Sequence, residues 1–318
     1  MSDSIEGPRG WCSPEFLADL AISALVSELE LFPKPGLVSP VDSGSHHDMD
    51  YALLRTSAIC LRGPFRELAR AGADGASFSS GLVPIGLQAE RLMMEATRGI
   101  NTHRGAIFSL GLLVAAAASV QEKPVCAEGI REAILSQWGP GLRAHAEDGV
   151  NAPGHGSAVR RTTGAGGARE EAAMGFPSIF ESALPSFTRL RDAGVPFREA
   201  GIETLFLLIA SVPDTNVIHR GGEEGGTFAR KCARAFLQSG GIRNPGWLEL
   251  ALQTHREFIA RNLSPGGAAD LLAGTIFLHS LLVARQGEAP PTTPAGSGRT
   301  ETNGPGLSLS QGPRGSAQ

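Results

Sequence analysis

The feature that most constrains this chain is an almost unbroken succession of predicted helices, without convincing stretches of alternating apolar and polar residues. The first helix opens with a cap, a proline and a first-turn acid in Ser13-Pro14-Glu15, and apolar residues then recur at helical spacing to Leu29. Further helices are predicted at 49–71, 84–98, 104–120, 124–137, 177–193, 196–211, 222–239, 244–262 and 265–285. The pattern predicts an all-α fold, a single multi-helix bundle of about ten helices.

Four segments can be separated by composition. Residues 1–12 are expected to be a flexible N-terminus, and residues 13–285 a single all-helical domain. Within that domain, residues 149–168 are rich in glycine and poor in apolar residues, which predicts a mobile surface loop. Residues 286–318 are mostly Gly, Pro, Ser, Thr and Gln, so we expect a disordered low-complexity tail.

Composition excludes several classes of protein. The net charge of −4 provides no basic field for nucleic acid. The four cysteines form no CxxC pair, which argues against a zinc ribbon or a disulfide framework. The N-terminus has no signal-peptide core, and the apolar runs are interrupted or shorter than the roughly 20 residues that span a bilayer. We therefore expect a cytoplasmic protein that does not cross a membrane.

The stretch from Leu31 to Asp50 connects two predicted helices and has an unusual composition. Lys34, one of only three lysines in the chain, lies between two prolines that restrict the backbone, and Gly36 permits close approach of a ligand. Asp42, His46, Asp48 and Asp50 follow, with oxygen and imidazole ligands. Two interpretations remain open: a phosphate-binding lysine beside a metal or general-base cluster, or a solvated turn in which Asp48 caps the next helix.

A second polar group, Asn101 to Gly105, immediately precedes the apolar stretch 106–120. A helix start offers unpaired N–H groups, and the helix dipole favours an anion there. Asn101, His103, Arg104 and Gly105 are therefore candidates for phosphate binding or base catalysis. The alternative is an ordinary Asn or Thr cap beside a structural histidine.

A third group, 212–222, follows the very apolar stretch 205–210. Asp214 at the end of a buried helix suits Mg²⁺, which prefers one or two carboxylates together with substrate phosphates. Arg220 is suited to bind a pair of phosphate oxygens, next to Gly221 and Gly222. The alternative is a helix stop made of turn residues.

A fourth group lies at Ser264–Asp270, where Ser264 is predicted to cap a helix that opens with Pro265. Glycines such as Gly266 and Gly267 cost about 1 kcal/mol each in a helix relative to alanine, so they indicate either ligand contact or close helix packing. Asp270 lies next to a strongly apolar helical stretch, where a lone carboxylate is costly unless it is paired or binds metal.

Residues 167–172 form a fifth group that contains Arg169 and Glu171 and would by itself be typical of an exposed helix start. Standard nucleotide motifs are absent, because the chain contains no GxxxxGK[ST] sequence and the glycine run 164–167 does not complete GxGxxG. The absence of GxSxG also argues against an α/β-hydrolase.

Taken together, these groups resemble the triphosphoribosyl-dephospho-CoA synthase family, in the same order and spacing over residues 13–285 or so. The matching stretches are PKPGLV (33–38), GSHHDM (44–49), NTHRGAIFSLGLL (101–113), GARE-EA (167–172), DTNV with RGG (214–222) and NLSPGGAADLL (262–272). Glu28 also lies where the family has a Glu. The chain differs from the family at Arg104, where Lys is frequent, and at Glu170, where Gly is frequent.

The resemblance implies transfer of the triphosphoribosyl group of ATP to the ribose 2′-hydroxyl of 3′-dephospho-CoA, with release of adenine. The product would be the prosthetic-group precursor for the acyl-carrier subunit of malonate decarboxylase or citrate lyase, and we favour the former. The expected partners are ATP, 3′-dephospho-CoA and either that acyl-carrier subunit or its prosthetic-group transferase, and an oligomer is possible.

The reaction suggests a role for each candidate residue. His46 or His103 would act as base for the 2′-hydroxyl, and Glu28 or Glu171 would stabilise positive charge on the ribose. Asp48, Asp214 and Asp270 would hold the Mg²⁺ that accompanies ATP. The predicted ATP and phosphate ligands are Lys34, Gly36, Asn101, Arg104, Gly105, Arg169, Asn216, Arg220, Gly221, Gly222, Ser264, Gly266 and Gly267.

Two other functions remain open at this stage. A Mg²⁺-dependent hydrolase of ADP-ribose-like compounds or nucleotides would use the same acidic pocket with water as the acceptor. A non-catalytic helical scaffold for an acyl-carrier partner would need no such pocket, and the costly glycines at 266 and 267 argue against it.

Overall fold

The structure is a computed structural model that describes residues 13–120, 126–148 and 166–285. In these residues every regular element is helical, and no strand is present, so the prediction of an all-α bundle is confirmed. The predicted N-terminal segment 1–12, most of the glycine-rich loop 149–168 and the tail 286–318 lie outside the described residues.

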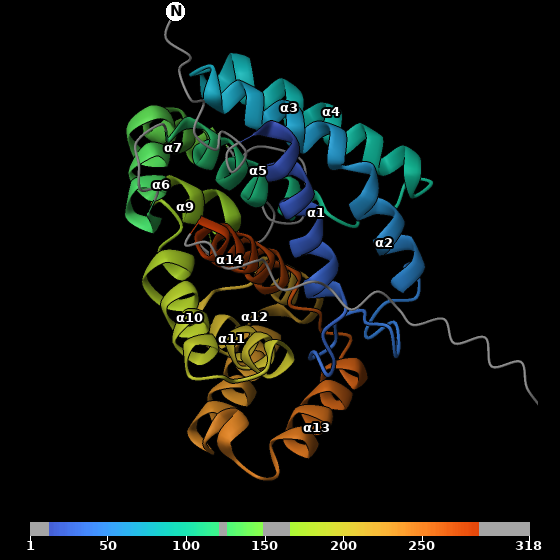
Figure 1. The fold of residues 1–318 in the computed structure, drawn as a ribbon. Helices are drawn as coiled ribbons and strands as arrows, with labels where there is room; N and C mark the ends of the chain where they lie inside the picture. The colour runs from blue at the N-terminus through green and yellow to red at the C-terminus, as the bar shows by residue number, and fades with distance from the viewer. Residues whose placement is uncertain (1–12, 121–125, 149–165, 286–318) are drawn as a thin grey trace, which may run out of the picture.

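The helices follow the order seen in Figure 1. Their bounds are α1 Pro14–Leu29, α2 Tyr51–Cys60, α3 Arg62–Ala73, α4 Val83–Ala96, α5 Arg104–Ser119, α6 Ala127–Ala133, α7 Gly139–Asp148, α9 Gly167–Ala173, α10 Leu184–Asp192, α11 Phe197–Ser211, α12 Thr215–Gln238, α13 Trp247–Ala260 and α14 Gly266–Arg285. Short π-helical turns at Phe78–Leu82, Ile134–Trp138 and Ser178–Ala183 lead into α4, α7 and α10, and a 3₁₀ turn at Gly241–Arg243 precedes α13.

Several predicted boundaries differ from the observed ones. The single helix expected at 49–71 is divided into α2 and α3 at the fully buried Leu61. Helix α7 was not predicted, since the expected helix stopped at 137. Helix α12 consists of two helical segments that meet at a kink at Gly222 (φ 66°, ψ −168°). The helix predicted at 222–239 corresponds to the second segment, and the first segment, which begins at Thr215, was not predicted.

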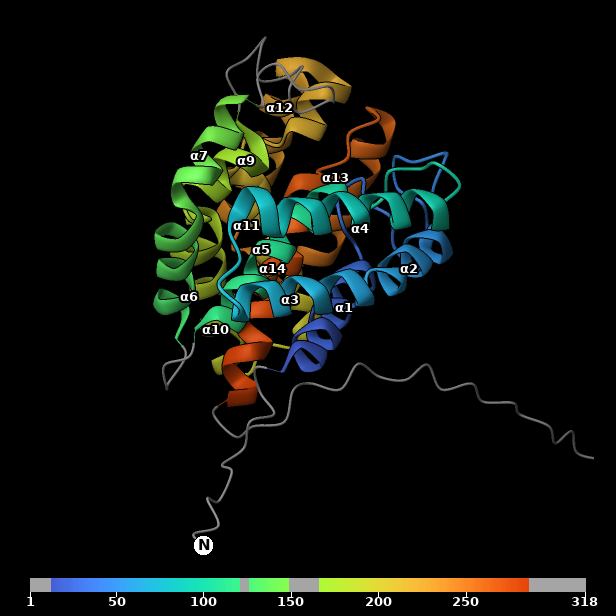
Figure 2. The same cartoon turned by 90° about the horizontal axis from the view of Figure 1, so that it is seen from above.

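Helices α5 and α14 form the centre of the bundle, and Figures 1 and 2 both show them surrounded by the other elements. Helix α14 packs against α1, α5, α10 and α11. By length and composition α14 would be able to cross a membrane, but 72% of its apolar window is buried within the bundle. Its apolarity is therefore explained by its position as a core helix.

The helix ends that position the site belong to α5, α12 and α14. The backbone N–H of Ala268 in α14 donates to Asp214 before α12, at 2.9 Å. Gly105 in α5 lies so close to the Asp270 carboxylate of α14 that a Cβ at this glycine would collide with it. Three helix starts that are far apart in sequence therefore meet, next to the connection between α1 and α2.

Candidate functional site

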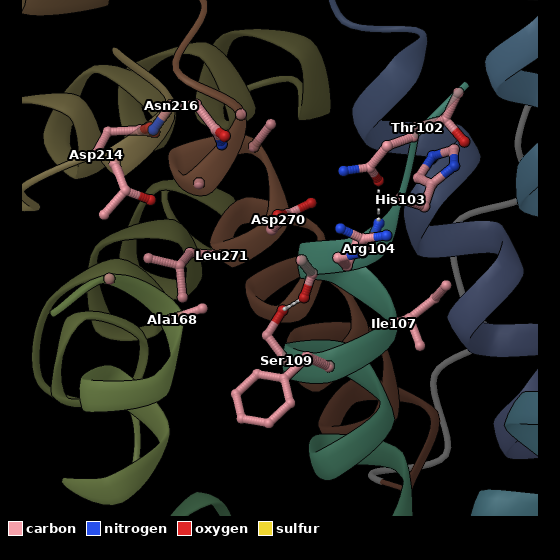
Figure 3. Close-up of a pocket in the computed structure, with 18 of the residues that line it drawn as sticks. Thr102, His103, Arg104, Ile107, Ser109, Ala168, Asp214, Asn216, Asp270 and Leu271 are labelled. Carbon is pink, nitrogen blue, oxygen red and sulfur yellow. Dashed lines mark hydrogen bonds between the residues drawn. The ribbon is translucent and has the colours of Figure 1, made fainter. Parts of the chain in front are cut away.

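A pocket of about 870 Å³ opens where these helix starts meet (Figure 3). Most of the residues predicted from the sequence line it: Glu28, Lys34, His46, Asp48, Asn101, His103, Arg104, Gly105, Arg169, Glu171, Asp214, Asn216, Arg220, Ser264, Gly266, Gly267 and Asp270. Polar groups from both halves of the sequence are thus brought to one pocket.

Three predicted glycines do not line the pocket; close packing explains two of them, and a positive φ explains the third. Gly36 has a φ of +65°, and a Cβ there would collide with the Leu263 carbonyl. A Cβ at Gly221 would collide with the Leu263 side chain, while Gly222 forms the kink in α12. Gly36 and Gly221 allow the chain segments around the pocket to approach one another.

Asp214 caps two helices at once. Its Oδ1 accepts the N–H groups of Asn216 (2.8 Å) and Val217 (3.2 Å) at the start of α12. Its Oδ2 accepts the N–H of Ala268 in the first turn of α14. Burial is the largest influence on this carboxyl and raises its pKa, while the N–H donors oppose that shift. Asp214 therefore joins α12 to α14, which the sequence did not indicate.

The two glycines at the start of α14 make room for side chains from α12. A Cβ at Gly266 would lie 2.9 Å from Asn216 Nδ2, and one at Gly267 would lie 3.0 Å from Asp214 Oδ2. The close-packing interpretation thus accounts for both residues, and both also line the pocket. The predicted cap Ser264 has another partner, since its Oγ lies 2.9 Å from His46 Nε2.

Asp270 is a half-buried carboxyl group close to two other carboxylates. Figure 3 shows it on α14 between Asp214 and the start of α5. Burial, together with the nearby carboxylates of Asp214 and Glu28, raises its pKa well above the ordinary value. An N–H group at the start of α5, that of Ala106, partly opposes this shift. Such a group is costly to the fold, which marks it as a functional candidate.

Lys34 is enclosed and paired with Glu28, and does not extend freely into the pocket. Its side chain is 1% exposed, and its Nζ donates to Glu28 Oε1 (2.7 Å) and to the Glu28 carbonyl oxygen (2.8 Å). Burial lowers the lysine pKa, and the Glu28 carboxylate opposes that change. A lysine has three N–H donors, so one remains for a ligand.

The connection that carries Lys34 is held by a histidine that the sequence analysis did not select. His255 of α13 is buried, and its Nδ1 lies beside the Gly36 N–H (3.2 Å) and the Lys34 carbonyl oxygen. Its Nε2 lies 3.0 Å from Asp42 Oδ2. Asp42 thus helps to position the connection. Asp50, and not Asp48, caps α2 by accepting the Leu53 N–H at 2.8 Å.

His46 has both ring nitrogens occupied. Arg220 Nη2 lies 3.1 Å from Nδ1, and a guanidinium can only donate, so Nδ1 of the neutral ring accepts. Nε2 then carries the proton and donates to Ser264 Oγ. Burial, followed by the charge of Arg220, lowers the His46 pKa, although Asp48 opposes this at 3.6 Å from Nδ1. This arrangement favours a positioning role for His46 over that of a base.

His103 lies deeper in the pocket at the start of α5. Its Nδ1 is 2.8 Å from Ser57 Oγ, which in turn lies 2.6 Å from Thr102 Oγ1. Burial, together with the Lys34 charge, lowers its pKa to about 4, so the ring is neutral at pH 7. Because the Ser57 contact uses Nδ1, Nε2 remains for a substrate group, and His103 is the better candidate for orienting a hydroxyl.

The other predicted polar residues lie nearer the pocket entrance. Arg104 is half-exposed and pairs with Glu90 at 2.9 Å, while Asn101 Oδ1 accepts the Arg104 N–H at 3.2 Å. Arg169 contacts the His145 carbonyl oxygen at 3.4 Å. Glu171 accepts from the Ser178 hydroxyl at 2.7 Å, and burial raises its pKa. Each of these residues has a local partner and also borders the pocket.

The predicted magnesium ligands do not form a preassembled metal cage. Within residues 13–120, 126–148 and 166–285, no group of three or more His, Cys, Asp or Glu side chains is placed to hold a metal ion. However, Asp214 and Glu28 lie close enough to Asp270 for their charges to raise its pKa, and Lys34 pairs with Glu28. This excess of negative charge fits a divalent cation that takes its remaining ligands from phosphates and water.

Several residues in or behind the pocket carried no recognisable signal in the sequence. Ser57 is one of three hydroxyl residues on the largely apolar helix α2, and His255 is a single histidine on α13. Phe78 and Phe108 are apolar residues that could equally belong to a core, and His145 lies on α7, which was not predicted. Only tertiary packing reveals that these side chains line the cavity or contact the residues that line it.

The chemistry of this pocket suits a polyanionic substrate above buried acids. Arginines at the entrance and helix starts can bind phosphate groups, and buried carboxylates can stabilise a cation. A neutral imidazole can exchange hydrogen bonds with a hydroxyl. The arrangement has the parts needed to bind a nucleotide and assist departure of its base.

Comparison with known proteins gives consistent results. A family model described as CitG: ATP:dephospho-CoA triphosphoribosyl transferase matches residues 14–288. A "Probable 2-(5''-triphosphoribosyl)-3'-dephosphocoenzyme-A synthase" of Pseudomonas aeruginosa (strain UCBPP-PA14) is 40% identical over 277 residues, covering 84% of this chain and 91% of that protein. Proteins with the same name from Stutzerimonas stutzeri (strain A1501) and Pseudomonas fluorescens (strain Pf0-1) are 40% and 39% identical, covering 84% and 86% of this chain and 92% and 94% of their own lengths. No solved structure shows significant similarity.

Proposed function

The chain belongs to the ATP:dephospho-CoA triphosphoribosyl transferase family, and from this premise we propose its reaction. It transfers the triphosphoribosyl group of ATP to the ribose 2′-hydroxyl of 3′-dephospho-CoA, and adenine leaves. The observation that carries this proposal is the convergence of the α5, α12 and α14 starts and the Lys34 connection around one pocket.

The phosphate chain is proposed to lie along the arginine side of the pocket. Arg220 is fixed by the Ser45 carbonyl oxygen (2.9 Å) and Asn262 Oδ1 (2.9 Å), so its guanidinium is positioned before substrate arrives. Arg104 and Arg169 border the same pocket and add positive charge. The start of α14 contributes less than its glycines suggest, because Asp214 already accepts N–H groups from its first turn.

We assign Mg²⁺ binding to Asp270, with Asp214 beside it. The fit rests on the like-charged environment of the half-buried Asp270, which a cation would relieve. Bound there, Mg²⁺ would supply neutralisation of the triphosphate. Asp48 is 60% exposed and near His46, so it would contribute from the pocket entrance.

Cleavage of an N-glycosidic bond places positive charge on the ribose. Glu28 is proposed to face this charge, and Lys34 keeps the Glu28 carboxylate in position through its two hydrogen bonds. The Nε2 atom of His103 is proposed to accept a hydrogen bond from the attacking 2′-hydroxyl. Glu171 retains its predicted role as an alternative source of negative charge, held by Ser178.

The two histidines can be distinguished by their effect on the pH dependence of kcat/KM. If His103 acts on the hydroxyl, the wild-type rate falls as pH decreases through about 4, where the ring becomes protonated. His103→Asn should remove this limb, whereas His46→Asn should mainly raise KM. The reverse pattern would assign the base to His46. Circular dichroism at each pH checks that the fold persists.

The product is proposed to serve an acyl-carrier subunit of malonate decarboxylase, with citrate lyase as the other candidate. The cytoplasm is the proposed location. We also propose that the protein associates with the acyl-carrier subunit or its prosthetic-group transferase, and measurement of its mass in solution tests whether it forms an oligomer. None of these is needed for the reaction itself.

The decisive experiment is incubation of the purified protein with ATP, Mg²⁺ and 3′-dephospho-CoA, followed by mass spectrometry. We expect free adenine and the enlarged coenzyme in equal amounts. Release of triphosphoribose or phosphate in the absence of dephospho-CoA would instead indicate the hydrolase. Absence of ATP binding by calorimetry would indicate the scaffold. Asp270→Asn, which keeps side-chain size, serves as the inactive control.

A further inference from the structure

One side of the pocket is apolar and has no part in the roles assigned above. It is lined by Phe78, Leu82, Leu87, Phe108, Leu112 and His145. Helix α5 relates this side to the acids, because Gly105 touches Asp270 while Phe108 and Leu112 are further along the same helix. At 1.5 Å per residue, these positions lie about 4.5 and 10 Å beyond Gly105 along the helix axis.

Three rings form what we call the aromatic wall: Phe78, Phe108 and His145. The His145 ring centroid lies 5.5 Å from that of Phe78, with an interplanar angle of 68°. It lies 5.7 Å from that of Phe108, with an angle of 31°. These separations are those of interacting aromatic pairs, so the three rings support one another as one surface.

The wall is held in place from behind. Gly141 in α7 allows close approach, because a Cβ there would lie only 3.1 Å from the Phe78 Cβ. Trp138, at the end of the π-helical turn before α7, donates from Nε1 to the Ala76 carbonyl oxygen at 2.9 Å and so ties this turn to the segment before Phe78. A rigid surface of this kind loses little entropy when a ligand binds.

Phe108 and His145 are only partly buried, although both are large rings beside the core. Leu87 across from them is 50% exposed. In a close-packed interior such rings would be covered on all sides. Here they retain surface that borders the cavity, which is the property of a ligand site lined by aromatic side chains.

The electrostatics of the wall suit an uncharged ring better than a phosphate. Burial, followed by the charge of Arg169, lowers the His145 pKa, so its imidazole is neutral at pH 7. A neutral imidazole has one donor and one acceptor. The edge of a purine also carries both kinds of group, and its face stacks on any aromatic ring.

We propose that the aromatic wall of Phe78, Phe108 and His145 stacks the adenine of a bound substrate, whose phosphates then extend toward Asp270 and Arg220. The inference rests on the proposed function, because ATP and 3′-dephospho-CoA each contain adenine. The shared chemistry is the purine ring, and the test below determines which substrate supplies it.

The test compares Phe108→Ala with Phe108→Tyr by isothermal calorimetry in Mg²⁺, using ATP, 3′-dephospho-CoA and inorganic tripolyphosphate. Loss of one stacking ring should raise Kd for the adenine-bearing ligand by roughly tenfold to a hundredfold. Phe108→Tyr keeps the ring and should bind almost normally. Tripolyphosphate, which has no base, should bind equally to wild type and both variants.

His145→Leu is a second test on a different helix and should show the same selectivity. Phe228→Leu is the matched control, because Phe228 is a partly buried ring that packs on Phe258 and Arg261, away from the pocket. A rise in Kd for ATP alone assigns the wall to ATP, and a rise for dephospho-CoA alone assigns it to the acceptor.

The proposal is overturned if both adenine ligands bind unchanged, or if tripolyphosphate binding weakens to the same extent. Because binding is measured without turnover, this outcome is separate from failure of the proposed reaction. A protein that releases no adenine but loses ATP affinity in Phe108→Ala would retain the adenine site and lose the transferase assignment.

Discussion

The pocket has two regions whose charged groups are held in different ways. The pocket floor comprises Glu28, Lys34, His103, Asp214 and Asp270. The first four are buried, with Lys34 only 1% exposed, and Asp270 is half-buried. The pocket rim, comprising Asp48, Arg104 and Arg169, lies at the entrance, and the side chains of Asp48 and Arg104 are 60% and 48% exposed. Both regions carry charge, but only the floor has been taken out of water.

The consequence can be seen in the direction of the pKa shifts. Burial is the largest cause in the floor, where it lowers the pKa of Lys34 and His103 and raises that of Asp214 and Asp270. Each shift favours the neutral form. A fold gains nothing by burying charge unless the charge serves another purpose. The charges of the floor should therefore serve activity at a cost in the free energy of unfolding. The charges of the rim should contribute to ligand binding and have little effect on stability.

Replacement of Asp214 should have the largest effect, because this residue caps two helices. We expect Asp214→Ala to lower the free energy of unfolding by about 2–4 kcal/mol, as backbone N–H groups of both α12 and α14 lose their acceptor. Turnover should fall by orders of magnitude. Urea unfolding followed by circular dichroism measures the first quantity, and adenine release the second.

Asp214→Asn is the control, since its remaining oxygen can still cap α12. It should lose roughly half as much stability as the alanine variant. A loss below about 1 kcal/mol in Asp214→Ala would show that the double cap is not important to the fold.

Asp270→Asn should separate stability from activity most clearly. The variant removes a half-buried carboxylate close to those of Asp214 and Glu28, so we expect stability to increase by about 1–3 kcal/mol in metal-free buffer. Activity should decrease at least about a hundredfold because the proposed magnesium ligand is lost. Thermal unfolding with EDTA and the adenine assay test the two statements. A less stable variant would place Asp270 among the structural residues.

His103 should make the fold sensitive to acid. Its pKa is about 4 in the folded protein, against 6.5 for an ordinary histidine, so the unfolded chain binds the proton first. The stabilising contribution is complete above pH 6.5 and is lost as pH falls to about 4, by up to about 3 kcal/mol. Urea unfolding at several pH values should show a weaker pH dependence in His103→Asn.

Ser57→Ala provides the comparison for that experiment. It removes the partner of Nδ1 but keeps the buried ring, so the slope between pH 6.5 and about 4 should remain. Identical slopes in wild type and His103→Asn would contradict the assignment of this acid sensitivity to His103.

The sequence predicted the residues of the site better than it predicted their partners. Helical periodicity and unusual polar residues at helix starts are local signals, so Asp214, Gly266 and Asp270 were recognisable as exceptions to a stable helix. Their partners were not recognisable. That Asp214 caps α14, or that Gly105 makes room for Asp270, depends on how distant helices pack.

Two other differences have the same cause. Lys34 was predicted as a phosphate ligand, and the structure adds that it forms a buried pair with Glu28, near the end of α1. Ser264 was predicted to cap α14, yet it lies beside His46. In both cases the local pattern identified a residue of the site, while tertiary contacts determined its partner. The aromatic wall had no local signal, because apolar rings at helical spacing are also typical of a core.

A substitution in the rim should cause the smallest change in stability, and it tests whether the exposed charges at the entrance act on ligand binding alone. Arg104→Ala removes a half-exposed pair with Glu90, which should change the free energy of unfolding by less than about 0.5 kcal/mol. Since Arg104 borders the pocket, KM for ATP should rise by roughly tenfold while kcat changes little. Arg70→Ala is the matched control, because its pair with Glu15 is similarly exposed and lies away from the pocket. A larger loss of stability in Arg104→Ala than in Arg70→Ala would mean that the rim is also built into the fold, and that burial does not separate the two regions.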